Sequence, residues 1–300
     1  MNLEQVLSLY GQVLCNEPMS AHTTYRIGGP VRFFIYPDNV TALMRILQIL
    51  EEAGVDWFVT GRGSNLLVPD ELFSGAVINL DKTLTDFYFE PDGTMFAQAG
   101  CALPLLATEA MKEGLSGLEF ASGIPGSLGG GLYMNAGAYK SDLSQVLKEV
   151  LVLRDRRIEW LPVQELDYTY RHSVFQDHPD WIILAARMQL TPGVQSEIRA
   201  LMENRRRRRI ESQPLNEACA GSTFRNPDAM PAWKIIDELG LRGMQVGGAR
   251  ISDKHSNFII NAGGATCADV KTLIELVKQK SLDTYGIEMI PEVECPQWSE

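Results

Sequence analysis

Three glycine-rich segments carry residue types that could hold a phosphate group. They are residues 60–67 (TGRGSNLL), 121–131 (ASGIPGSLGGG) and 25–30 (YRIGGP). Glycine permits positive φ angles and lets backbone N–H groups converge on an anion, and hydroxyl and amide side chains such as Ser64 and Asn65 add donors. One such segment alone is best explained as a tight turn. Two of them, about sixty residues apart in one domain, favour a cradle for a diphosphate.

The common nucleotide-binding motifs do not account for these loops. Neither loop is a Gly-x-Gly-x-x-Gly turn inside a strand–helix–strand unit with an acidic residue about 20 positions later. The chain also has no Gly-Lys-Ser/Thr P-loop. Residues 132–138 (LYMNAGA) end in small residues, and this stretch suits a helix end that presses against a flat ligand. Together these features favour a dinucleotide cofactor held by a different fold.

Hydrophobic periodicity and turn residues predict the elements that position the loops. Helices are expected over residues 39–54, 103–112, 195–210, 232–239 and 268–285. Strands are expected over 57–60, 75–80, 87–89, 95–97, 146–153 and 181–190, with a turn at 91–93 and a polar connection between the last two. After residues 191–193 the expected elements change from strands alternating with helices to three helices and a loop. This change indicates an α/β domain up to about residue 192 and a smaller α+β domain after it.

Composition limits the classes of function. A chain of 300 residues is longer than one hydrophobic core usually supports, so we expect two or three packed modules. Its 27 basic and 38 acidic residues give a net charge of −11, which argues against a broad nucleic-acid surface. The five cysteines are widely separated, so we expect no metal site, no disulfide framework and a reducing compartment. The N-terminus lacks signal-peptide features, and no apolar run approaches the roughly 20 residues that span a bilayer. We therefore expect a cytoplasmic protein without membrane insertion.

Seven short motifs occur in order along the chain: residues 24–30 (TYRIGGP), 61–67 (GRGSNLL), 123–130 (GIPGSLGG), 135–139 (NAGAY), 170–175 (YRHSVF), 220–227 (AGSTFRNP) and 291–293 (PEV). This series closely resembles the UDP-N-acetylenolpyruvoylglucosamine reductase family, also called UDP-N-acetylmuramate dehydrogenase or MurB. The short link after Arg171 is similar to the form of the family that lacks an extra tyrosine-bearing insertion. Two features depart from the family pattern: Arg62 in the variable place of its loop, and the tail from Glu294, which does not continue as an apolar strand.

The resemblance implies an α+β fold with two parts. Residues 1–192 would form a two-subdomain FAD-binding module of the vanillyl-alcohol-oxidase (PCMH) type, with subdomains at about 1–82 and 83–192. Residues 193–300 would form a C-terminal α+β substrate-binding domain. Some relatives of this flavin fold attach FAD covalently through a histidine in the first glycine loop. That loop contains no His or Cys here, so we expect non-covalent FAD.

The implied reaction is the NADPH-dependent reduction of UDP-N-acetylglucosamine enolpyruvate to UDP-N-acetylmuramate in peptidoglycan precursor synthesis. Arg171 would engage the substrate carboxylate, Ser222 would donate the proton to the enolate carbon, and Glu292 would lie beside the carboxylate. Without the resemblance, Arg171 would be read as a surface arginine, Ser222 as a turn or helix-cap serine and Glu292 as a solvated strand residue. Glu294 is the competing choice for Glu292.

The resemblance also implies the ligand contacts. The expected FAD-binding residues come from the glycine-rich motifs: Tyr25, Gly61, Arg62, Gly63, Ser64, Asn65, Leu66, Gly123, Ile124, Pro125, Gly126, Ser127, Gly130, Asn135, Ala136 and Gly137. The expected nucleotide-sugar contacts are Asn226, Lys254, His255 and, from the run Arg205–Arg209, Arg206 and Arg209. Most arginines of that run must be solvated, because a helix points them in all directions.

Two rival functions remain open on the sequence. One is a flavin oxidase of the same fold that acts on an alcohol. The other is a non-catalytic nucleotide-binding or RNA-binding module built around Arg205–Arg209, which the acidic balance of the chain disfavours. We expect a monomer or a weak oligomer. We also expect the tryptophans to pack in the core, at domain interfaces or, for Trp298, in the tail.

Overall fold

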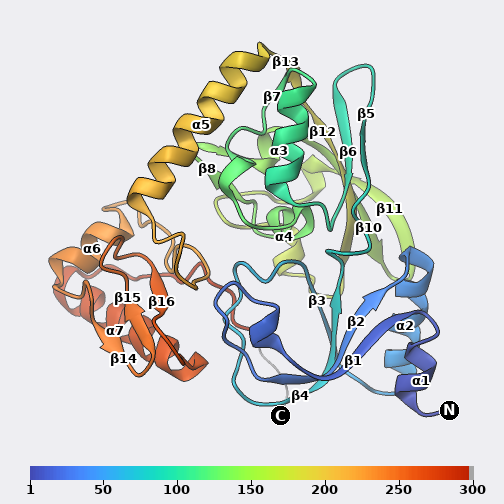
Figure 1. Cartoon of the computed structure of the whole chain (residues 1–300), viewed down its shortest axis with the longest axis horizontal. Coiled ribbons are helices and arrows are strands. Elements are labelled where there is room, and N and C mark those ends of the chain that lie inside the picture. Colours follow the sequence, from blue (N-terminus) through green and yellow to red (C-terminus); the bar gives the residue numbers. More distant parts are fainter. Residues whose placement is uncertain (297–300) are drawn as a thin grey trace. The chain divides into compact units, whose positions relative to one another are not determined.

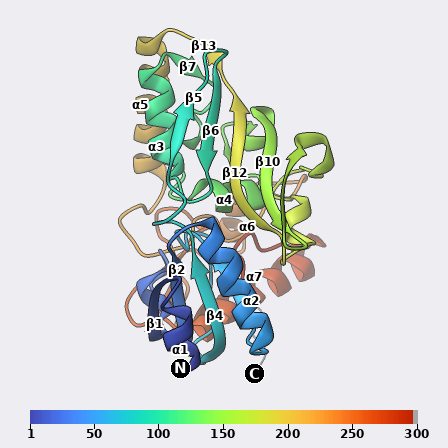
Figure 2. The same cartoon turned by 90° about the vertical axis from the view of Figure 1, so that its right-hand side faces the viewer.

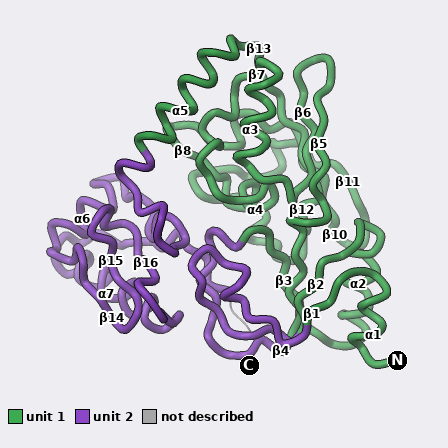
Figure 3. The backbone as a smooth tube through the Cα atoms, viewed as in Figure 1, with its two compact units in different colours: residues 1–14, 33–62, 75–208 green, residues 15–32, 63–74, 209–300 purple. Residues whose placement is uncertain are grey.

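A computed structural model describes residues 1–296 of the chain, so Trp298 lies outside the described residues. The chain forms two compact units (Figure 3). Unit 1 contains residues 1–14, 33–62 and 75–208, and unit 2 contains residues 15–32, 63–74 and 209–300. Two segments from the N-terminal part of the chain therefore fold with the C-terminal residues. The expected domain boundary at 192/193 stays a prediction, because these units follow spatial contacts and not sequence order.

The first sheet has the strand order β1-β2-β4-β3, with β3 parallel to β4. Its strands are β1 (Gly11–Pro18), β2 (Pro30–Pro37), β3 (Trp57–Thr60) and β4 (Phe73–Asn79), and its helices are α1 (Leu3–Leu7) and α2 (Val40–Glu52). The Asn39 side chain caps α2 by accepting a hydrogen bond from the Ala42 N–H. The apolar face of α2 packs against β2 and β4 in one core. Gly61, in the first glycine loop, directly follows β3.

The second sheet lies wholly in unit 1, with neighbouring strands antiparallel in the order β11-β10-β12-β6-β5. Figure 2 shows β10, β12, β6 and β5 side by side, with α3 and α4 beside them. The bounds are β5 (Phe87–Phe89), β6 (Thr94–Gln98), β10 (Leu147–Arg154), β11 (Arg157–Pro162), β12 (Ile182–Gln189), α3 (Leu103–Lys112) and α4 (Leu128–Tyr133). Their apolar side chains share a core, which fixes the second glycine loop between α3 and α4. The short pairs β7 (Leu115–Ser116) with β13 (Thr191–Pro192) and β8 (Gly137–Ala138) with β9 (Ser141–Asp142) complete this part.

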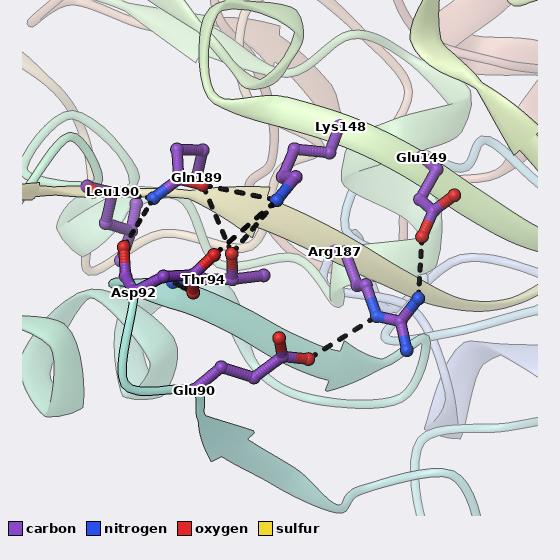
Figure 4. Close-up of polar contacts among 8 residues, drawn as sticks. All are labelled: Glu90, Asp92, Thr94, Lys148, Glu149, Arg187, Gln189 and Leu190. Carbon is purple, nitrogen blue, oxygen red and sulfur yellow. Dashed lines mark hydrogen bonds and ion pairs between the residues drawn. The ribbon is translucent and has the colours of Figure 1, made fainter.

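Charged and polar side chains join the strands of this second sheet (Figure 4). Arg187 on β12 donates to Glu149 on β10 at 2.7 Å, and the hydrogen bond from this pair raises the pKa of the Arg187 guanidinium. Lys148 on β10 donates to the hydroxyl of Thr94 on β6 at 3.2 Å, across the intervening strand β12. Cross-strand pairs of this kind each contribute roughly 0.2–1 kcal/mol, so they support a register that the core already sets.

Unit 2 holds a three-stranded antiparallel sheet, in the order β14-β15-β16, and helices α6 and α7 (Figure 1). The bounds are α6 (Ala232–Glu238), β14 (Gln245–Val246), β15 (Ala249–Ile251), β16 (Ile259–Asn261) and α7 (Cys267–Tyr285). Helix α5 (Gln195–Ser212) belongs to unit 1 up to Arg208 and to unit 2 from Arg209. Thr266 and Asp269 form a capping box at the start of α7, and Gly286 ends it with a φ of 65°. Among residues 1–296, no helix has both the length and the apolarity to cross a membrane.

One hairpin was missed by the sequence prediction. The connection expected to be polar contains β11, which pairs with β10. The turn places Asp155 and Arg156 at φ values of 49° and 59°, the left-handed region that a two-residue hairpin needs. Glycine or asparagine marks such turns in most sequences, and neither residue occurs here. The turn at 91–93 was predicted correctly: Gly93 has a φ of 82° and connects β5 to β6.

Candidate functional site

The first and second glycine loops meet in unit 1. A Cβ atom on Gly61 would lie 2.1 Å from the Ser127 Oγ, so a side chain at this position would force Ser127 to move. The Asn79 side chain holds the Gly61 carbonyl through a 2.8 Å hydrogen bond. On the other side, the Leu103 N–H donates to the Gly126 carbonyl, and Ser127 caps α4. The expected proximity of the two loops is thus present in the structure.

Several backbone N–H groups at this contact are available to a ligand. Within residues 1–296, no protein group accepts a hydrogen bond from the N–H of Gly61, Arg62, Gly126 or Ser127. The Ser127 side chain is 3% exposed, so these amides stand at a partly enclosed place. Backbone N–H donors on two loops that approach this closely fit the diphosphate of a dinucleotide such as FAD. The residues present therefore fit that group.

The rest of the first loop folds within unit 2. Gly63 has a φ of 60°, and a Cβ there would lie 2.1 Å from the His22 carbonyl oxygen. The Thr24 N–H donates to the Gly63 carbonyl, so this loop packs on the third glycine-rich segment. The Asn65 side chain donates to the Glu292 carbonyl at 2.9 Å. Leu66 pairs with the C-terminal segment in an isolated β-bridge.

Tyr25 lies in the core of unit 2. Its side chain is 2% exposed, and its hydroxyl donates to the Ile259 carbonyl at 2.8 Å. Burial raises the pKa of the Tyr25 phenol well above its ordinary value. The hydroxyl therefore already has a structural partner, and the cofactor contact expected for Tyr25 stays a prediction.

Ser222 and Glu292 belong to neighbouring segments of unit 2. The Glu292 N–H donates to the carbonyl of Thr223, the residue after Ser222, at 2.8 Å. Asn257, 3% exposed, fixes the same segment: its amide group both accepts from the Phe224 N–H at 3.0 Å and donates to the Phe224 carbonyl at 2.9 Å. The segments that carry the two predicted catalytic residues are thus paired by backbone hydrogen bonds.

Glu294, the competing choice for Glu292, is fixed in the same segment. Its N–H donates to the Asn65 carbonyl and its carbonyl accepts from the Leu67 N–H, both at 2.8 Å. Burial raises the pKa of the Glu294 carboxyl, and Arg225 opposes that effect. Both acids are therefore anchored to the first glycine loop, and the choice between them stays a prediction.

Arg171 lies in unit 1 next to the segment of small residues. Its φ is 57°, and its guanidinium donates to the Gly137 carbonyl at 2.8 Å. The buried Asn135 side chain donates to the Thr169 carbonyl and accepts from the Ser144 N–H, which holds residues 135–137 and Arg171 together. Arg171 belongs to unit 1, whereas Ser222 and Glu292 belong to unit 2. The convergence of the three side chains stays a prediction.

The remaining cofactor candidates have local roles in unit 1. Gly123 ends a 3-10 helix, Ile124 packs against the core, and Pro125 is exposed. The Gly130 N–H donates to the Ser127 Oγ at 3.4 Å. The Ala136 N–H donates to the Gly131 carbonyl at 2.7 Å. These contacts shape the loop and do not decide which residues touch a cofactor.

Three predicted substrate contacts in unit 2 also have structural partners. The Asn226 side chain accepts a hydrogen bond from the Ala232 N–H at 3.0 Å, at the start of α6. The Lys254 ammonium donates to the Ile210 carbonyl. The His255 Nδ1 accepts from the Asn257 N–H at 3.3 Å, and burial, followed by the charge of Arg242, lowers the pKa of the His255 imidazole.

The arginine run on α5 spreads over different surroundings. Arg206 lines a cavity of about 460 Å³, together with Met111 and Lys112 of α3 and Ser122 of the second glycine loop. Arg209 donates to the Gln213 side chain at 3.1 Å. The Arg205 and Arg208 guanidinium groups lie 5.0 Å and 5.7 Å from the centre of the Tyr139 ring. Residues at i and i+3 lie on the same face of a helix, so the spacing of Arg205 and Arg208 could have predicted that they contact one residue.

Asn79 and Asn257 are the positioning residues that sequence reasoning missed. Asn79 is 2% exposed at the end of β4, a strand predicted from its apolar residues. A polar residue that closes a buried strand signals a specific hydrogen bond, since a buried amide must be satisfied. Within the described part of the chain, no group of three or more His, Cys, Asp or Glu side chains could hold a metal ion.

Comparisons with known proteins agree along the whole chain. The FAD binding domain profile matches residues 30–156, and the profile of the C-terminal domain of UDP-N-acetylenolpyruvoylglucosamine reductase matches residues 213–296. The chain is 46% identical over 285 residues to the UDP-N-acetylenolpyruvoylglucosamine reductase of Anoxybacillus flavithermus, which covers 95% of this chain and 94% of that one. It is 45% identical over 292 residues to UDP-N-acetylenolpyruvoylglucosamine reductase 1 of Bacillus anthracis, at 97% coverage of both. The crystal structure of this reductase (MurB) from Thermus caldophilus superposes with a TM-score of 0.82 at 33% identity, covering 96% of this chain and 100% of that one.

Proposed function

Because the chain belongs to the UDP-N-acetylenolpyruvoylglucosamine reductase family, we propose that it reduces the enolpyruvyl double bond of UDP-N-acetylglucosamine enolpyruvate. The product is UDP-N-acetylmuramate, a precursor of peptidoglycan, and the reaction takes place in the cytoplasm with NADPH as hydride donor and non-covalent FAD. One observation carries the proposal: 46% identity extends over 95% of the chain and includes both the FAD-binding part and the C-terminal part. The fit of the Gly61–Ser127 contact to a diphosphate supports it.

Bound FAD supplies the hydride-transfer chemistry that amino-acid side chains lack. The chain's own contribution begins with binding. The N–H groups of Gly61, Arg62, Gly126 and Ser127 hold the diphosphate, and the absence of a side chain at Gly61 keeps the loops close enough to do so. The other members of the glycine-rich motifs complete the cofactor site.

Arg171 has the role of stabilising developing negative charge. Hydride addition to the enolpyruvyl group places charge on the neighbouring carboxylate, where a planar cation interacts most strongly. The hydrogen bond from Arg171 to Gly137 restricts the side chain, so less freedom is lost when substrate binds.

Ser222 donates the proton to the enolate carbon, and Glu292 orients the carboxylate or the donor. The support for this pairing is the 2.8 Å hydrogen bond from the Glu292 N–H to the Thr223 carbonyl, which joins the segments that carry the two residues. Asn65 also donates to the Glu292 carbonyl, so the backbone of this segment has hydrogen-bond partners on both sides before substrate binds. For the nucleotide sugar, we assign contacts to Asn226, Lys254, His255, Arg206 and Arg209.

An anaerobic experiment tests the reaction. The purified protein is expected to be yellow, to lose the flavin absorbance near roughly 450 nm on addition of NADPH, and to recover it on addition of UDP-N-acetylglucosamine enolpyruvate. Recovery by oxygen alone at a comparable rate, with no response to this substrate, would identify an alcohol oxidase of the same fold. A colourless protein that binds RNA with a steep salt dependence would instead support the nucleic-acid alternative.

Replacing Ser222 separates the two half-reactions. In Ser222→Ala, reduction of the flavin by NADPH should stay near the wild-type rate, and reoxidation by substrate should slow by about 10²–10⁴-fold, because the proton donor is lost. Stopped-flow absorbance measures both rates, with Ser196→Ala on the exposed side of α5 as control. Equal slowing of both half-reactions would contradict the assignment. Glu292→Gln should give the same asymmetry and Glu294→Gln should not; the opposite result would move the assignment to Glu294.

A further inference from the structure

A cavity of about 460 Å³ opens between α3 and α5, which lie side by side in Figure 1 and Figure 2. Its lining residues come from these two helices and from Ser122 of the second glycine loop, and all of them belong to unit 1. Two hydrogen bonds join the helices at one end: the Gln195 side chain donates to the Lys112 carbonyl at 3.1 Å, and the Gly193 N–H donates to the Gly114 carbonyl at 2.8 Å. The volume falls in the range of small-molecule sites, roughly 300–1,000 Å³.

Two arginines of α5 line this cavity without a protein partner. Arg199 and Arg206 are seven residues apart, so they lie on the same face of the helix, about 10 Å apart along its axis. Within residues 1–296, neither guanidinium group makes a hydrogen bond or an ion pair. Lys112 adds a third positive charge, which it shares with Glu109 at 2.8 Å, and Glu203 is the one acid among the lining residues. The lining is therefore positive and suits an anion.

The uncharged lining residues indicate what else the ligand carries. The Thr108 and Ser122 hydroxyls already donate to backbone carbonyls, at 2.7 Å and 2.8 Å, so their oxygens are left to accept hydrogen bonds from ligand hydroxyl groups. Met111 and Met202 give the cavity an apolar part, and thioether sulfurs make favourable contacts with aromatic rings. The cavity thus offers cations for an anion, acceptors for hydroxyl groups and an apolar surface for a ring.

We propose that this cavity binds a nucleoside diphosphate, at a site separate from the nucleotide-sugar contacts assigned to unit 2. The diphosphate offers several oxygens to the planar donors of Arg199 and Arg206, whose long side chains can converge on one ligand. The ribose hydroxyls donate to the two hydroxyl oxygens, and the base lies against the two methionines. The inference does not rest on the reductase activity. Because Arg206 is also a candidate contact for the nucleotide sugar, the test uses Arg199.

Titration calorimetry of the full-length, FAD-loaded protein with ADP tests the site. Arg199→Gln should weaken ADP binding about threefold to tenfold, because a charge-assisted contact to phosphate is lost. The control is Arg207→Gln, an exposed arginine of the same helix that does not line the cavity, and it should keep the wild-type affinity. Lys254→Gln should also keep it, since Lys254 belongs to unit 2. Absence of ADP binding, an equal affinity in Arg199→Gln, or a loss in Lys254→Gln would overturn the proposal.

Parts of the ligand test its chemical class in the same experiment. Inorganic pyrophosphate reports the cations alone, adenosine reports the ring and ribose alone, and ribose 5-phosphate lacks the base. Each should bind about tenfold or more weakly than ADP, because each leaves one part of the lining without a partner. ADP binding should also weaken as the salt concentration rises, since the arginines are exposed to solvent. If pyrophosphate or ribose 5-phosphate bound as tightly as ADP, the cavity would not be a nucleotide site.

Discussion

At the scale of single residues, the absence of a side chain can matter as much as its presence. Gly61 connects a strand end to the first glycine loop and lies against Ser127. Gly61→Ala should lose flavin, because its Cβ would lie 2.1 Å from the Ser127 Oγ and push the loops apart. The ratio of flavin to protein absorbance measures occupancy, and circular dichroism reports the fold.

A matched control for Gly61→Ala is Gly193→Ala. The nearest atoms to a Cβ at Gly193 are in the side chains of Ile198 and Ser116, at 3.1 Å and 3.2 Å, and such side chains can adjust. This variant should retain flavin. Full flavin occupancy in Gly61→Ala would contradict the proposed cradle.

Glu294 makes a prediction about pH. Burial raises its pKa in the folded protein above the ordinary value of 4.5, so the folded state holds the proton more tightly than the unfolded state. The stability that this protonation contributes is full below pH 4.5 and is lost as pH rises through the raised value. Glu294→Gln should therefore raise the unfolding midpoint at pH 7 and flatten its pH dependence above 4.5. Thermal melts across that range measure the effect, with the exposed Glu288→Gln as control; a lower midpoint at pH 7 would refute it.

At the scale of elements, local signals predicted where helices begin and end. The helix expected at residues 103–112 is α3, with the same bounds. The helix expected to start at Asn39 is α2, which Asn39 caps. The missed strand β11 shows the opposite case, because Asp155 and Arg156 adopt left-handed backbone conformations without glycine. The periodicity of a helix depends on residues close together in the chain, so the sequence predicts it. The turn at Asp155 and Arg156 depends on the pairing of β10 with β11, so these two residues do not predict it.

The capping box of α7 gives a prediction for an element. Thr266→Ala removes the hydroxyl that accepts from the Asp269 N–H at 3.1 Å. The free energy of unfolding should fall by about 0.5–2 kcal/mol. Thr272→Ala, at an exposed position inside the same helix, should change it by less than about 0.5 kcal/mol. Urea denaturation measures both, and equal effects would show that the cap does not stabilise the helix.

At the scale of the whole molecule, sequence order and spatial grouping differ. Residues 15–32 and 63–74 fold with residues 209–300, and Tyr25, Ile27 and Leu67 belong to the core of unit 2. The predicted boundary at residue 192 follows a change in sequence character. A boundary drawn along the sequence cannot show that residues 15–32 and 63–74 pack with residues far away in the chain.

A fragment of residues 1–192 tests this difference. It lacks most of unit 2, so Tyr25, Ile27 and Leu67 would lose their burial, at a cost of roughly 1.5–3 kcal/mol for each large apolar side chain. The fragment should bind a hydrophobic dye and give a broad thermal transition, unlike the full chain. A sharp, native-like transition in the fragment would support an independent domain that ends at residue 192.

The sequence by itself determined the family resemblance, most helices and the loops that could hold a diphosphate, because these depend on residues close together in the chain. Tertiary structure decided which distant groups meet: Gly61 with Ser127, and Glu292 with Thr223. It also showed that Asn79 and Asn257 position the candidate site. Periodicity records which face of an element is buried, whereas contacts between distant residues arise only when the cores assemble.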